Sequence, residues 1–115
     1  MSYQVELSPE AIDSIDEQVL WFETQVRPDG DALAERWLRE LRVSLKLLAR
    51  TPERHALAAE NGKWHPEVTL RRMLFRPWQS GRGWRVLFWI DKARRTVRVL
   101  LVRHESRPPL AEEES

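Results

Sequence analysis

The stretch that decides the fold is Trp84-Arg85-Val86-Leu87-Phe88-Trp89-Ile90, which is followed after five residues by Thr96-Val97-Arg98-Val99-Leu100-Leu101-Val102-Arg103. Both stretches are rich in β-branched and aromatic residues, which favour strands. The connection of residues 91–95 is short and polar. Because a parallel crossover needs about a dozen residues or more, these two strands must be antiparallel neighbours.

A third strand is predicted at residues 70–76, immediately before this pair. The connection of residues 77–83 contains two glycines and a proline, which are typical of turns. The three strands therefore form an antiparallel meander. The preceding residues 53–69 are polar and irregular, with Asn61-Gly62 as a predicted turn.

The first half of the chain predicts one short strand and two helices. Apolar and polar residues alternate over residues 3–7, which indicates a half-buried strand. Ser8-Pro9-Glu10 is typical of a helix start, and Arg27-Pro28-Asp29-Gly30 breaks that helix. Asp31 is predicted to cap a second amphipathic helix, which ends at Thr51-Pro52. The prediction is an α+β domain of order β-α-α-β-β-β, with an antiparallel sheet packed on a helical hairpin, over residues 1–107; residues 108–115 are expected to be a flexible acidic tail.

The composition narrows the class of protein. The chain of 115 residues contains six tryptophans and no cysteine, which excludes disulfides and thiolate metal sites. No apolar stretch reaches the roughly 18 residues of a membrane helix, so we expect a soluble cytoplasmic protein with no membrane partner. His55 and His65 lack metal-ligand spacing, and we expect neither a metal nor another cofactor.

Charge is divided unevenly along the chain. Residues 1–60 contain 7 Lys and Arg against 12 Asp and Glu, whereas residues 61–115 contain 12 against 6. Half of those six acids lie in the terminal run Glu112–Glu114. A basic half of this density fits an anionic partner, either nucleic acid or an acidic protein segment. A solvated basic surface without a partner is the other interpretation.

Strand parity predicts which side chains share a face, because successive side chains of a strand point to opposite sides. One face of the meander is predicted to pack on the helices. The other is predicted to collect arginines, one histidine and apolar residues among them: Arg72, Leu74, Arg76, Arg85, Leu87, Trp89, Arg98, Leu100, Val102 and His104. An exposed patch of this kind marks a binding site in many soluble proteins.

Two of these residues have competing interpretations. Arg85 either contacts a partner or forms a structural ion pair with Asp91 or Glu105. His104 is either an acid or base near neutral pH, or it closes the strand end with a hydrogen bond.

The chain resembles the RelE/ParE superfamily of bacterial toxins, which includes plasmid stabilisation proteins, over about residues 3–107. The resemblance rests on Leu7-Ser8-Pro9-Glu10-Ala11 and on Thr51-Pro52-Glu53-Arg54. Its most specific stretches are the strand motifs Leu70–Phe75, Trp84–Asp91 and Val99–His104 with Arg107. It implies the toxin of a type II toxin–antitoxin pair, with a cognate antitoxin as partner. RelE-like members cleave mRNA on the ribosome, and ParE-like members inhibit DNA gyrase.

The resemblance also implies functional residues. If the chain is a nuclease, Arg85, His104 and Arg72 correspond to catalytic positions. The binding face for RNA, gyrase or antitoxin would comprise Arg72, Arg76, Arg85, Leu87, Trp89, Arg98, Leu100 and Arg107. The nuclease set is incomplete, because Leu74 and Glu105 stand where basic residues are expected and the C-terminal tyrosine is missing.

These departures slightly favour ParE-like inhibition of gyrase by a growth-arresting toxin that is not an enzyme. A ribosome-dependent mRNA endonuclease is the alternative. A non-toxic nucleic-acid or protein-binding module on the same fold is the alternative of another class.

Overall fold

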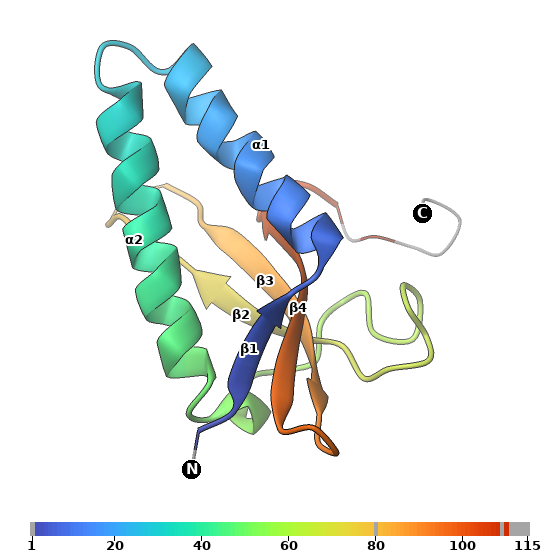
Figure 1. The fold of residues 1–115 in the computed structure, drawn as a ribbon. Helices are drawn as coiled ribbons and strands as arrows, with labels where there is room; N and C mark the ends of the chain where they lie inside the picture. The colour runs from blue at the N-terminus through green and yellow to red at the C-terminus, as the bar shows by residue number, and fades with distance from the viewer. Residues whose placement is uncertain (1, 80, 109, 111–115) are drawn as a thin grey trace.

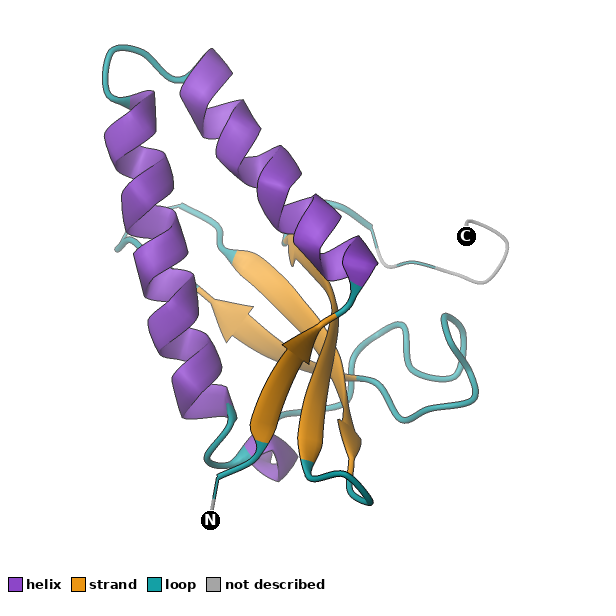
Figure 2. Ribbon diagram, in the orientation of Figure 1, coloured by secondary structure: helices purple, strands orange, loops and turns teal. Residues whose placement is uncertain are grey.

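The computed structural model describes residues 2–79, 81–108 and 110, and it places two helices against one face of a four-stranded sheet (Figure 1). In chain order the elements are β1 (Gln4–Leu7), α1 (Pro9–Gln25), α2 (Gly30–Leu48), a 3-10 helix η1 (Pro52–Arg54), β2 (Arg71–Phe75), β3 (Trp84–Asp91) and β4 (Thr96–His104). Figure 2 shows the long loop between η1 and β2 on the side away from α2. The predicted α+β class and the order of elements are confirmed.

The sheet is mixed, which the sequence did not predict. Its strand order is β1-β4-β3-β2, and β1 runs parallel to β4 with Val5 aligned to Val97. The other two pairings are antiparallel, as the short connections indicated. Connection length constrains only strands that follow each other, whereas β1 pairs with a strand some ninety residues later. The helical hairpin carries the chain back so that the two strands meet.

Local sequence explains how the hairpin forms. The backbone N–H of Ala11 donates to the Ser8 side chain at 3.0 Å, so Ser8 is the N-cap of α1, with Pro9 as its first residue. The cap of α2 is Asp29, and the predicted Asp31 lies in the first turn instead. A Cβ at Gly30 would lie 2.1 Å from the carbonyl oxygen of Phe22. Only glycine therefore allows the two helices to approach this closely at the turn.

The core lies between the helices and the sheet and is dominated by aromatic rings. Trp37 of α2 is fully buried and packs edge-on against Phe75 of β2 and Trp84 of β3, with ring centroids 5.6 Å away in both cases. Phe22 of α1 joins the same cluster. Each such side chain contributes roughly 1.5–3 kcal/mol or more by leaving water. None of the helices in the described part of the chain is long and apolar enough to cross a membrane.

Candidate functional site

A β-bulge decides which side chains of β4 face which way. Leu87 pairs with Leu101 but Phe88 pairs with Val99, so Leu100 is an extra residue on β4. Because an extra residue reverses the alternation, the prediction for the end of β4 was wrong. Val102 lies in the helix-side core, and His104 packs edge-on against Trp84 at 5.1 Å. Arg103, which pairs with Arg85 across the strands, takes the place predicted for His104.

The face turned away from the helices, here called the outer face, is partly covered. The loop of residues 55–70 folds over its middle, and Ala58, Trp64 and Leu70 pack on Leu87 in a second apolar cluster. Leu87 is fully buried and Leu100 is half-buried against this cluster. The prediction that both would be exposed was therefore wrong, because strand parity reports the face of a residue but not what covers that face.

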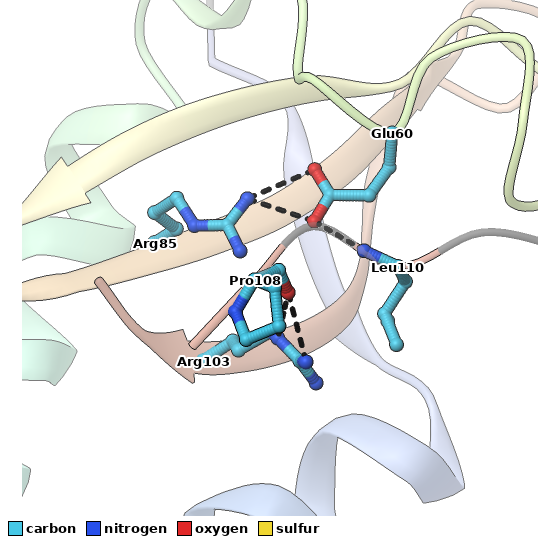
Figure 3. Close-up of polar contacts among 5 residues, drawn as sticks. All are labelled: Glu60, Arg85, Arg103, Pro108 and Leu110. Atoms are coloured by element: carbon cyan, nitrogen blue, oxygen red, sulfur yellow. Dashed lines mark hydrogen bonds and ion pairs between the residues drawn. The ribbon is translucent and has the colours of Figure 1, made fainter. Parts of the chain in front are cut away.

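Arg85 lies under the same loop, in a buried ion pair with Glu60. Its Nη1 donates to both carboxylate oxygens, at 2.9 and 2.8 Å, and Glu60 is completely buried (Figure 3). The structural interpretation of Arg85 is the one observed, with a partner other than the two expected acids. Its Nη2 is buried and has no hydrogen-bond partner among the described residues. Removing one member of such a pair is costly, because the other charge stays buried.

The beginning of the predicted acidic tail lies against this ion pair. The backbone N–H of Leu110 donates to Glu60 at 3.2 Å, and the Leu110 side chain joins the second apolar cluster (Figure 3). The carbonyl oxygen of Pro108 accepts from Arg103 at 2.9 and 3.1 Å. Pro108 and Leu110 thus contact the outer face. The acidic run of residues 112–114 lies outside the described residues.

At the other end of β3 and β4, Arg98 is held by its neighbours. It donates to Asp91 at 3.0 Å and to Glu6 at 3.2 Å. Its guanidinium lies 5.8 Å from the ring of Trp89. Arg98 and Trp89 therefore share the predicted face but form a separate network, in which the positive charge is neutralised by two carboxylates.

One open part of the outer face is a basic depression of about 420 Å³. It is lined by Arg72, Leu74, Arg76, Arg82, Arg85 and Glu105. Sequence reasoning did not select Arg82, which lies in the β2–β3 connection and gave no strand signal. We call this site the basic depression.

Glu105 organises one wall of the basic depression. It accepts the backbone N–H of Gly83 at 2.6 Å and Arg76 at 2.9 Å. These two hydrogen bonds, with that of Gly83 the stronger cause, hold the pKa of the Glu105 carboxyl below its ordinary value. Arg72 and Arg82, by contrast, make no side-chain hydrogen bond or ion pair within the described residues, although the charge of Arg82 also helps to lower the pKa of Glu105. They are the two cations of the depression that are available to a ligand.

His104 lies in a different site, a groove of about 630 Å³ between α1 and the end of β4. Trp21, half-exposed on α1, lines the same groove, as do Trp84 and Arg107. The Nδ1 of His104 accepts the backbone N–H of Ser106 at 3.1 Å. This is the hydrogen bond at the strand end that the second interpretation of His104 expected. The exposed Trp21 was a possible signal for this groove, since an exposed tryptophan on a helix is unusual.

The predicted site residues are therefore not brought together. Arg72 and Arg76 line the basic depression, and the largely buried Arg85 borders it. The loop covers Leu87 and Leu100. Two further regions hold the remaining residues, which are Trp89 and Arg98 in one and His104 and Arg107 in the other. No group of three possible metal ligands occurs within residues 2–79, 81–108 and 110.

The fold is that of a small α+β domain with a basic depression on its sheet, and comparison with known proteins identifies the family. The family model described as the ParE toxin of the type II toxin–antitoxin system parDE matches residues 5–109. The chain therefore belongs to this family within the RelE/ParE superfamily, and it is the toxin of a type II toxin–antitoxin system. The partner of such a toxin is its cognate antitoxin.

Among the solved structures that are similar is a chain from the toxin–antitoxin complex RelBE2 of Mycobacterium tuberculosis. It shares 21% sequence identity with this chain at a TM-score of 0.48, over 91% of this chain and 100% of that one. Among curated proteins no match is found.

Proposed function

We propose that this toxin arrests growth by binding DNA gyrase, without cleaving RNA. The observation that carries the proposal is the separation of the three candidate catalytic residues. Arg85 and Arg72 belong to the outer face, whereas His104 packs against Trp84 on the helix side. Acid–base catalysis needs the acting groups within hydrogen-bond reach of one reacting centre. The sheet lies between these residues, which weighs against their acting together on one phosphate.

The burial of Arg85 supports the same proposal. A residue that stabilises a developing negative charge must reach it with an uncompensated positive charge. The Arg85 side chain is 10% exposed, and its charge is neutralised by Glu60. Arg85 thus stabilises the loop on the sheet, and the cations that remain for a target are Arg72, Arg82 and Arg107.

One observation favours the second candidate function, ribosome-dependent mRNA cleavage. The buried Nη2 of Arg85 has no hydrogen-bond partner among the described residues, and Arg85 borders the basic depression. A phosphate oxygen is one acceptor that would satisfy this N–H.

Two assays on purified toxin separate the candidates. Gyrase supercoiling of relaxed plasmid should be inhibited by the toxin at stoichiometric concentrations. Primer extension on mRNA from translating ribosomes should show no cuts that depend on the toxin. Toxin-dependent cuts together with unimpaired supercoiling would overturn the proposal in favour of the nuclease. Toxin that is folded but arrests neither growth nor gyrase would overturn both candidates.

A further inference from the structure

The outer edge of β2 is only half occupied. β2 is an edge strand of the sheet. A short segment of the loop pairs with its first part, where the Arg72 N–H donates to Ala56 at 3.0 Å and the Ala58 N–H donates to Leu70 at 2.9 Å. These bonds show which residues of β2 direct their backbone groups away from β3.

Because backbone direction alternates along a strand, the carbonyl of Arg72 and both backbone groups of Leu74 also point to the open side. Met73, between them, pairs with β3 instead. Across residues 2–79, 81–108 and 110, these three outward groups of Arg72 and Leu74 have no hydrogen-bond partner. The sheet therefore ends in a short row of free donors and acceptors beside the basic depression.

The two sides of this free edge differ in chemistry. On the outer side lie Arg72 and Arg76 with the rest of the basic depression. On the helix side a second hollow, of about 490 Å³, lies between α2 and β2 and is bordered by Leu47 and Leu74. Both leucines are substantially exposed, at 56% and 42%, respectively. A strand placed here would meet the arginines of the basic depression on one face, and on the other a mixed hollow in which Leu47, Leu48 and Met73 lie beside Arg54.

The geometry points to this edge as a docking site for an extended segment of the antitoxin, which would add a fifth strand beside β2. Addition of a strand to an exposed edge uses backbone hydrogen bonds for affinity and alternate side chains for specificity. The segment should carry acidic residues at alternate positions, facing Arg72, and apolar residues between them, facing Leu47. The inference rests on the antitoxin partnership and not on the identity of the target.

A second copy of this chain fits the edge less well. Pairing β2 with β2 would bring arginines against arginines, which is destabilising across strands. The other edge strand, β1, alternates polar and apolar residues, but its single acid, Glu6, is already bound to Arg98. Joining β1 to β2 head to tail would also produce open-ended fibres. The antitoxin is thus the occupant that the charges favour.

The direct test is amide hydrogen exchange of the wild-type complex, made by co-expression with the antitoxin. The Leu74 amide should exchange at least about tenfold more slowly in the complex than in free toxin, because a strand bond would protect it. Equal exchange in both states would overturn the proposal. Slow exchange that appears in free toxin as its concentration is raised would also overturn it, by assigning the edge to a second copy.

A matched pair of variants tests the backbone contact separately. Leu74→Pro removes the outward N–H, which an edge strand tolerates, whereas Leu74→Ala keeps it. Loss of the bond should weaken antitoxin binding by roughly tenfold in the proline variant relative to the alanine variant. Equal affinities would contradict strand addition. Gyrase supercoiling is measured on the same variants, so failure of the docking site is distinguishable from failure of the proposed target.

Discussion

Two cross-strand pairs on the outer face contain the same residue types and have opposite environments. Arg72 pairs with Leu87, and Leu74 pairs with Arg85. In the first pair the leucine is completely buried, and in the second the leucine is 42% exposed while the arginine is buried. The difference comes from the loop of residues 55–70, which covers β3 and leaves the outer part of β2 open. Residues that share a face therefore do not share an environment.

The largest expected effect is on stability, in the region that the loop covers, at Glu60. Glu60→Met should lower the free energy of unfolding by about 3–5 kcal/mol, because Arg85 would be left buried and unpaired. The double variant Glu60→Met/Arg85→Met should recover most of that loss, since two apolar side chains can replace a buried ion pair. Urea denaturation of the wild type, Glu60→Met, Arg85→Met and the double variant gives the four corners of the cycle. A double variant no more stable than Glu60→Met would contradict the assignment.

Substitutions of Leu87 and Leu74 test whether the loop covers one leucine and leaves the other exposed. Leu87→Ala should destabilise the protein by about 2–5 kcal/mol, as a large-to-small change in a packed core does. Leu74→Ala, on the same face of the neighbouring strand, should change stability by less than about 0.5 kcal/mol. Thermal and urea unfolding measure both. Similar losses in the two variants would mean that the loop does not distinguish the two regions.

Substitutions in the basic depression, which the loop leaves open, should affect activity and not stability. Arg82→Glu and Arg72→Glu should each raise the toxin concentration needed for half-inhibition of gyrase by about tenfold or more, because a reversed charge repels an anionic partner. Arg94→Glu, in the exposed β3–β4 turn, is the matched control for the charge change. Unfolding curves of all three should overlay that of the wild type. A control as defective as the depression variants would indicate that only net charge matters.

The smallest expected effect is a pH dependence at Glu105. Its folded pKa is lowered by the Gly83 N–H and by Arg76, so its contribution to stability is complete above the ordinary glutamate pKa of about 4.3. That contribution is lost as the pH falls through the lower, folded pKa. Glu105→Gln should therefore show a shallower loss of stability below about pH 4.3 than the wild type. Parallel slopes in unfolding experiments between pH 2.5 and 5 would exclude this role.

Most of the fold was predictable because it depends on short-range patterns. The N-cap at Ser8, the apolar stripes of the helices and the short connections of the meander all act within a few residues. The candidate site was predicted less well. Arg72 and Arg76 lie at the open depression, but His104 was assigned to the wrong face because one extra residue, Leu100, reverses the alternation. Nothing local to Leu100 distinguishes it from a regular strand residue.

By itself, the sequence determined the α+β class and the identity of the three meander strands, because periodicity and turn residues are local properties of the chain. Only the tertiary structure decided which arginines are available. Glu60 and Arg85 are 25 residues apart and form their ion pair through a loop with no regular secondary structure, and β1 finds β4 across the helical hairpin. Contacts of this kind depend on how the whole chain packs. An ion pair such as that of Glu60 and Arg85 is buried only where distant segments of the chain meet and exclude water from both side chains, and no local pattern in the sequence reports this.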